Sequence, residues 1–486
     1  MRLPFLARAW LLPVASAGLV ALLATVPADR VASTAYAQAG GAAPPPCAPP
    51  TSGGPPPVQP TTITTIEQAY DCIFAHYFGG AGLDDRPLLS GAFAGLTQEL
   101  ARLGKDQADA TLPPFSGDRA ADWTAFSALY QRLTAELPAD PAVLQAVAAA
   151  TLTGMVGSLH DNHARWVHQE VPPGFAPGDA YGLGIVTSPG LALATNEPQE
   201  ALPPLFVSAI QGGPAADRGL RPGDIILAVD GAPPFVDGVV SEGVIGLLTQ
   251  QFPQDDPVRV TLRRPATGRT WTVTMKPALF QLSAAASAPF TSRLLPGDVA
   301  YVALAGFSPN AVDGALQAIA DMSAGRTLKG VVLDLRGNRG GSPVAVARLL
   351  GAFVHGKVWS YDCDPSNVCR ANQTNDGVAL LHLPLVVLTD RDCASACDAF
   401  SGAVKDLGIG PLVGTRTSGI VAGPATGYLL TDNSDLLLPS EHELGANREI
   451  INGIGVAPDY LVPLTAQDLS AGRDPDVARA LSLLAG

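Results

Sequence analysis

The hydrophobic residues of the chain change their spacing twice. From residue 62 to about residue 172 they recur on one helical face, as between Ile66 and Tyr77, which predicts a helical domain. From Tyr181 onward, short alternating runs separated by glycines predict a β-rich domain. After Val299, apolar runs alternate with helical stretches, which predicts an α/β core with a partly parallel sheet. The predicted domains are 62–172 (helical), 178–280 (β-rich) and 290–470 (α/β core), followed by a C-terminal tail at 471–486.

The same pattern predicts individual elements. In the β-rich domain we expect a helix near Ser241–Gln250 and strands at 184–186, 205–207, 225–229, 258–262 and 271–275. In the core we expect strands at 300–304, 331–335 and 385–389, with helices at 343–355 and 398–405. The chain is therefore expected to be a multidomain α/β protein.

The first 39 residues have a different character from the rest of the chain. Arg2 and Arg8 precede an apolar stretch at 9–26, and small residues typical of a cleavage site follow at 35–39. This order predicts a secretory signal peptide, and the short apolar stretch favours it over a retained membrane anchor. Residues 40–61 form a Pro/Gly-rich linker. We therefore expect an exported protein, periplasmic or secreted, with no integral membrane segment after signal cleavage.

Composition narrows the classes of partner. The chain is 47% hydrophobic and 15% charged, which is enough apolar material for sizeable cores. Its formal net charge is −14, and because the leader carries +2, the remainder carries −16. An acidic exported protein is a poor candidate for binding nucleic acid or anionic lipid. Protein or peptide partners are therefore favoured, and the oligomeric state is left open.

All six cysteines lie after the leader, in a chain that we expect to be exported, so disulfides are plausible. Their spacing leaves the pairing open. The candidate pairs are Cys47–Cys72, Cys363–Cys369 and Cys393–Cys397. The last pair would enclose Ser395. A zinc site is the alternative, but the paired spacings with histidines that it needs are absent.

Ser395 is the strongest candidate for a reactive side chain. It lies between the predicted strand 385–389 and the predicted helix 398–405. A serine on such a turn has an exposed hydroxyl, with the free N–H groups of the helix start behind it. Acyl-enzyme chemistry needs both features, although a lone serine at a helix start is ordinarily a helix cap.

A glycine-rich turn at Asp334–Gly341 closes another predicted strand and precedes a helix. Glycines there allow backbone groups to approach a reacting atom closely. A phosphate-binding loop is the alternative, but the lysine and hydroxyl that it requires do not follow.

The β-rich domain resembles a PDZ domain. The resemblance rests on Gly213–Ala216 and Gly219–Ile226, which look like its central signature. It implies that a carboxylate-binding loop consists of Tyr181, Gly182, Leu183, Gly184 and Ile185. Such a loop captures a peptide terminus while the peptide adds a strand to the sheet. A module that only packs between domains is the alternative.

Together, four strings resemble the tail-specific, or C-terminal processing, serine protease family. They are Asp334–Gly341, the turn at Ser395, Val413–Thr417 and Gly453–Asp459, and with the PDZ-like domain the resemblance covers residues 62–470. It implies a C-terminal core of the ClpP/crotonase-like type and a serine peptidase without metal or cofactor.

The chain departs from the branch of this family in which a lysine 25 residues after the serine is the base. That position is Ile420 here, and Lys405 lies on the helix after the serine. The other branch resembles the tricorn protease core and uses a histidine from the helical domain, within a Leu-x-Asp-Gly-His pattern. The matching string, Leu159–His163, implies that His163 is the base. We therefore expect a Ser–His pair.

The third member of the triad is less well defined. The tricorn-like branch has a glutamate where this chain has Asn452, and Glu449 lies nearby in the sequence. For the oxyanion hole we expect the N–H of Ala396 together with that of Gly340 or Gly341.

Two functions follow from these expectations. The first is an exported serine peptidase acting through Ser395 and His163. The second is a catalytically inactive protease fold that binds peptide termini through the PDZ-like domain. The serine turn and His163 favour the first function, whereas the missing lysine and Asn452 favour the second.

Overall fold

The computed structural model describes residues 46–49, 56–188 and 202–485. These residues form two compact units. One, the helical unit, contains the described residues up to 170 together with 424–440, and the other contains 171–423 and 441 onward. The predicted signal peptide lies outside the described residues. Within the described ranges, no helix is both long enough and apolar enough to cross a membrane.

The helical unit packs its helices around one apolar core that includes Tyr70, Phe126 and Leu152. Aspartates cap three of the helices: the side chain of Asp84, for example, accepts the Arg86 N–H. Its elements are α1 (Ile63–His76), η1 (Gly80–Gly82), α2 (Asp85–Arg102), α3 (Arg119–Ala135), α4 (Pro141–Gly157), β1 (Arg165–Val167), β18 (Ala425–Leu429) and β19 (Asp435–Pro439).

A hairpin from far along the chain completes this unit. β18 and β19 form a sheet with β1, in the order β1-β19-β18. Leu436 and Leu438 of β19 are buried in the core of the unit, and Thr61 donates its hydroxyl to Asp432 at 2.7 Å. Residues 424–440, which the sequence pattern assigned to the 290–470 core, therefore pack in the helical unit instead. A turn-separated pair of strands carries no local signal for the domain that it joins.

The β-rich domain has the predicted strands and the predicted helix. Its main sheet is antiparallel, in the order β3-β4-β5-β8-β9, so β3 lies at an edge. Its elements are β2 (Asp179–Gly182), β3 (Ile185–Ser188), β4 (Phe206–Ile210), α6 (Gly213–Asp217), β5 (Ile225–Val229), β6 (Phe235–Val236), β7 (Val239–Val240), α7 (Glu242–Leu248), β8 (Val258–Arg264), β9 (Arg269–Met275) and β10 (Ala278–Gln281).

The C-terminal core is built on a six-stranded sheet in the order β11-β12-β13-β16-β17-β21, parallel from β12 onward. A second sheet has the order β15-β14-β20. The elements are α8 (Ala284–Ser287), β11 (Phe290–Leu295), β12 (Val299–Leu304), α9 (Pro309–Ser323), β13 (Gly330–Asp334), α10 (Pro343–Gly351), β14 (Val358–Cys363), β15 (Cys369–Gln373), β16 (Leu385–Thr389), α11 (Ala396–Asp406), β17 (Leu412–Gly414), β20 (His442–Gly445), β21 (Tyr460–Leu461), α12 (Ala466–Ser470) and α13 (Pro475–Leu484).

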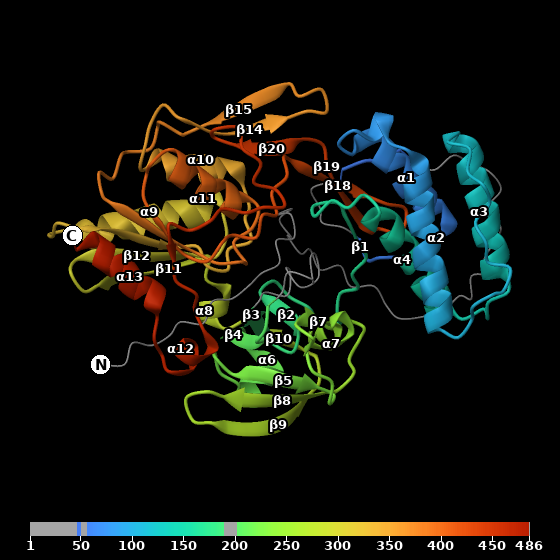
Figure 1. The fold of residues 1–486 in the computed structure, drawn as a ribbon, viewed down its shortest axis with the longest axis horizontal. Coiled ribbons are helices and arrows are strands. Elements are labelled where there is room, and N and C mark those ends of the chain that lie inside the picture. Colours follow the sequence, from blue (N-terminus) through green and yellow to red (C-terminus); the bar gives the residue numbers. More distant parts are fainter. Residues whose placement is uncertain (1–45, 50–55, 189–201, 486) are drawn as a thin grey trace. The chain divides into compact units, whose positions relative to one another are not determined.

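Side chains alternate between the two faces of the six-stranded sheet because successive residues of a strand point to opposite sides. Val302 and Leu333 face the layer formed by α9, α10 and α11. Tyr301 and Val332 face α13 on the other side. The sheet is thus covered on both faces, and Figure 1 shows α10 and α11 on the side opposite α13. The predicted α/β class is confirmed.

The segment expected to be a C-terminal tail is part of the core. α13 packs on the sheet through Val477 and Ala480. Arg336, at the end of β13, makes ion pairs with Asp334, Asp474 and Asp476 at 2.8 Å each. The pattern missed this helix because its anchor is one arginine about 140 residues earlier.

Three disulfides join Cys47 to Cys72, Cys363 to Cys369 and Cys393 to Cys397. All three candidate pairs of the sequence analysis are therefore confirmed. The first lies in the helical unit and the second links β14 to β15.

We expect Arg336→Ala to lower the free energy of unfolding by about 3–5 kcal/mol, because it leaves buried carboxylates without their partner. Arg348→Ala is the control: Arg348 pairs with Asp313 at the surface, and its loss should change stability by about 0–1 kcal/mol. Urea unfolding of both variants measures the difference. Equal effects would show that the Arg336 cluster does not anchor α13.

Candidate active site

Ser395 has an unusual backbone conformation. It is the N-cap of α11, with φ 58° and ψ −123°. A non-glycine residue with positive φ is strained, typically by about 1–3 kcal/mol, and persists only when its surroundings enforce it. Here the Ser395 N–H donates to the Ile420 carbonyl at 2.6 Å and to Asp398 Oδ2 at 3.0 Å. The chain therefore makes a sharp strand-to-helix turn with the serine at its apex.

The disulfide Cys393–Cys397 encloses this turn. Both cysteines are fully buried. Cys397 lies in the first turn of α11, and the Cys393 carbonyl accepts the Ser418 N–H at 2.9 Å. The covalent link thus restricts the backbone on both sides of Ser395.

Asp398 is a buried carboxylate that the sequence analysis did not single out. Besides the Ser395 N–H, it accepts the N–H groups of Gly419 at 2.9 Å and Ile420 at 3.2 Å, and the Ser418 hydroxyl at 3.2 Å. Burial raises its pKa to about 6, although these hydrogen bonds oppose the shift. Asp398 therefore holds residues 418–420 against the serine turn. Its spacing from Ser395, three residues into a helix, is a capping-box signal that could have revealed it.

The glycine-rich loop lies directly beside Ser395. Gly340 has φ 97°, and a Cβ placed on it would lie 2.6 Å from the Ser395 Cβ and 2.8 Å from the Ala396 nitrogen. Only glycine fits such an approach. The N–H groups of Ala396 and Gly341 have no acceptor among the residues that the structure describes, whereas Gly340 donates its N–H to Asn338 Oδ1 at 2.9 Å. Of the two expected loop donors, Gly341 is therefore the one left available.

Asn338 fixes this loop and was also missed by the sequence analysis. It is completely buried. Its amide nitrogen donates to the Leu304 carbonyl at 3.0 Å, and its own carbonyl accepts the Ala394 N–H at 3.0 Å. The Asn338 side chain thus connects β12 to the glycine-rich loop, and its backbone carbonyl connects the same residue to the serine turn. Within a Gly-Asn-Arg-Gly string the sequence gives no signal of this role.

The structure places the two residues that bear on a lysine base, Ile420 and Lys405. Ile420 lies at the position where a lysine occurs in the Ser–Lys branch, and its carbonyl contacts the Ser395 N–H. Lys405 instead donates to the Ala457 carbonyl at 2.8 Å and pairs with Asp459 at 3.3 Å. The lysine on α11 is thus committed to partners outside the serine turn.

The two candidates for the third triad member lie in different places. The side chain of Asn452 accepts the Val421 N–H at 3.1 Å, next to Ile420 and therefore near the serine turn. Glu449 lies beside Asp406 in the last turn of α11, where burial and this second carboxyl raise the pKa of Asp406 to about 7. That turn is about 15 Å along the helix from Ser395. Glu449 therefore lies away from the serine turn.

His163 belongs to the helical unit, between α4 and β1. Its N–H donates to Asp161 Oδ1 at 2.8 Å, and its ring Nδ1 lies 2.8 Å from Asn162 Oδ1. Burial lowers the pKa of His163 to about 4; Asp161 opposes this shift and Arg165 adds to it. The imidazole is therefore neutral near neutral pH, as a general base must be.

The predicted carboxylate-binding loop spans the end of β2 and the start of β3. The Tyr181 hydroxyl donates to the Gln254 carbonyl at 2.7 Å. Gly184 has φ 78°, and a Cβ on it would lie 2.0 Å from the Gly212 carbonyl oxygen. The edge position of β3 leaves one side of that strand without a partner strand within the described residues. These features suit addition of a peptide strand.

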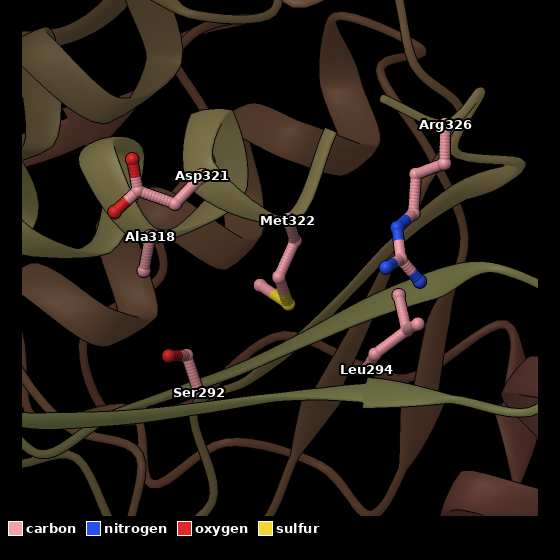
Figure 2. A pocket seen from close by; sticks show the side chains of 6 residues that line it. All are labelled: Ser292, Leu294, Ala318, Asp321, Met322 and Arg326. Carbon is pink, nitrogen blue, oxygen red and sulfur yellow. The ribbon is translucent and has the colours of Figure 1, made fainter. Parts of the chain in front are cut away.

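A hollow of about 350 Å³ lies elsewhere in the core, between β11 and the C-terminal part of α9. In Figure 2, Met322 of α9 lies between Ser292 and Leu294, which both belong to β11, and Arg326 follows the end of the helix. None of the candidate catalytic residues lines this hollow. Among the described residues, no group of three or more His, Cys, Asp or Glu side chains is arranged to hold a metal ion.

Comparison with known proteins gives two family matches. Residues 298–462 match Peptidase family S41, and residues 185–237 match the PDZ domain. One relative is the chloroplastic C-terminal processing peptidase of Tetradesmus obliquus, 33% identical over 302 residues that cover 57% of this chain and 60% of the relative. Another is Tricorn protease homolog 1 of Streptomyces coelicolor, 34% identical over 158 residues, which are 32% of this chain and 14% of that protein.

A solved structure shows the same fold. Mature CPAF complexed with lactacystin aligns with a TM-score of 0.50 at 15% identity, covering 82% of this chain and 98% of that one. The chain spans only about three fifths of the length of the Tetradesmus relative. These matches agree with the resemblance noted in the sequence: residues 298–462 are similar to peptidase family S41, and a region similar to a PDZ domain precedes them.

Proposed function

We propose that this protein is an exported serine peptidase that hydrolyses peptide bonds near the C-termini of protein or peptide substrates. The observation that carries the proposal is the strained turn at Ser395, with two N–H donors beside it. Strained backbone conformations cluster at active sites, where they form part of the mechanism. The match of residues 298–462 to peptidase family S41 supports the same chemistry.

In the proposed mechanism the Ser395 hydroxyl attacks the scissile carbonyl while His163 Nε2 takes its proton. The N–H groups of Ala396 and Gly341 stabilise the oxyanion of the tetrahedral intermediate. The imidazolium then protonates the leaving amine, and the C–N bond breaks to give an acyl-enzyme. Water, deprotonated by His163, hydrolyses the ester and restores the serine. Each proton that His163 takes is returned, and no atom changes its oxidation state, so the steps balance without an oxidant or reductant.

The PDZ domain supplies the preference for termini in this proposal. A carboxylate bound at Tyr181–Ile185 with a peptide strand along β3 would deliver a protein C-terminus to the enzyme. The names of C-terminal processing relatives support this assignment. Export is supported by the leader and by three disulfides, which persist in oxidising compartments.

A second function is peptide binding by an inactive protease fold. It is favoured by Ile420 at the position of the family's lysine and by Asn452 at the position of the glutamate. A fluorophosphonate probe separates the two functions because only an activated serine is phosphonylated.

We expect purified protein to react with a fluorophosphonate and Ser395→Ala to show no reaction. His163→Ala should react about 10²–10⁴-fold more slowly, because general-base catalysis is lost. His160→Ala, in the same loop but exposed, is the control and should react like the parent. Absence of labelling in the parent protein would favour the binding function.

Gly340→Ala should slow labelling by at least about 10²-fold, since its Cβ would overlap Ser395 and displace the oxyanion donors. Gly356→Ala is the matched control: Gly356 also has positive φ, 67°, but a Cβ there meets no atom within 4 Å. It should lose some stability and keep its labelling rate. The proposal for the loop fails if both variants label equally well.

Replacing Cys393 and Cys397 by alanine should reduce the labelling rate about ten- to a hundredfold, as release of about 1–3 kcal/mol of strain lets the serine turn relax. The double variant of Cys363 and Cys369 removes a disulfide between β14 and β15 and should label normally. Thermal unfolding of both variants shows whether each remains folded at the assay temperature. Equal labelling by the two would mean that the disulfide does not hold the turn.

A further inference from the structure

The imidazole of His163 is fixed by the residue before it. Its Nδ1 lies 2.8 Å from Asn162 Oδ1. An amide oxygen only accepts hydrogen bonds, so Nδ1 carries the ring proton and Nε2 keeps its lone pair. This is the tautomer that a general base needs.

The backbone around the pair is fixed as well. Asp161 Oδ1 accepts the N–H groups of both His163 and Ala164, at 2.8 and 3.2 Å, and its Oδ2 accepts the Tyr77 hydroxyl at 3.1 Å. An aspartate that bonds the backbone two and three residues ahead forms a rigid local turn. The turn begins soon after α4 and ends at β1, so both of its ends are anchored in regular structure.

The sequence departs from the family pattern at two positions, and both concern the orientation of the histidine base. The pattern has glycine before the histidine, and this chain has Asn162. The tricorn-like branch has glutamate where this chain has Asn452, whose side-chain oxygen accepts the Val421 N–H and whose surface is exposed. We propose that Asn162 is the positioning residue of the base and takes the place of the glutamate. The inference rests on the proposed function, in which His163 is that base.

An amide orients the ring without adding charge. The charged groups that face the His163 ring are Asp161 and Arg165, and Arg165 also interacts with Asp435 of β19. With a neutral Asn162, burial keeps the imidazole unprotonated, and the imidazolium formed during the reaction gains less stabilisation than a carboxylate would give. The arrangement thus secures orientation but favours a slower enzyme.

The test uses four variants of the full chain. Asn162→Gly restores the family residue and removes the acceptor, and Asn162→Asp keeps the acceptor and adds charge. Asn452→Asp makes the same change at the glutamate position, and Asn367→Asp, in an exposed turn between β14 and β15, is the control. Two quantities are measured: the rate of fluorophosphonate labelling and the pKa of the His163 ring by NMR, assigned with His163→Ala. Ring ¹⁵N shifts report which nitrogen carries the proton.

We expect Asn162→Gly to label at least about tenfold more slowly than the parent. This loss is part of the roughly 10²–10⁴-fold acceleration that a general base supplies. The variant should also lose the preference for the Nδ1–H tautomer. Asn162→Asp should keep labelling and raise the pKa of His163 by about 1–3 units. Asn452→Asp and Asn367→Asp should leave that pKa unchanged.

The inference is overturned if Asn162→Gly labels at the parental rate, or if Asn452→Asp shifts the His163 pKa and Asn162→Asp does not. If Asn162→Gly unfolds, Asn162→Asp decides through the pKa. The labelling rate and the ring tautomer of the parent protein together show whether the proposed function or the role of Asn162 has failed. A parent protein that is not labelled contradicts the function, whereas a parent with protonated Nε2 contradicts the role of Asn162.

Discussion

The site depends on one constraint, the left-handed backbone of Ser395. A φ of 58° is energetically unfavourable for a residue with a side chain, and four independent contacts hold Ser395 in it. They are the Ile420 carbonyl, the Asp398 carboxylate, the adjacent Gly340 and the Cys393–Cys397 disulfide. The strained conformation places the Ser395 hydroxyl at the apex of the turn. It also leaves the first N–H of α11 without an acceptor among the described residues.

The supporting residues come from different elements, which explains why the turn is rigid. Asn338, which follows β13, makes one hydrogen bond each to β12, to Gly340 of its own loop and to the serine turn. Arg336, two residues earlier, ties the same loop to α13. Gly341, one of the two candidate oxyanion donors, therefore lies on a loop that buried polar contacts fix on both sides. Such fixed donors need no rearrangement when charge develops.

Local patterns revealed much of the fold and part of the site. Strand and helix periodicity gave the three domains, and Ser395, Gly340 and Gly341 stood out because glycines and a serine at strand ends have a geometric meaning. Asn338 did not stand out, since its side-chain bond to β12 joins residues distant in sequence. Asp398 had a local capping-box signal, but its bonds to residues 418–420 could not be predicted from it. The hairpin at 424–440 and α13 were misassigned for the same reason: one pairs with β1 and the other with Arg336.

A crystal structure of the fluorophosphonate adduct would test the central claim most directly. The account predicts phosphonylated Ser395 with its backbone still at positive φ, and a phosphoryl oxygen within about 3 Å of the Ala396 and Gly341 nitrogens. An adduct with a relaxed serine at negative φ, or with the phosphoryl oxygen directed away from both N–H groups, would contradict it.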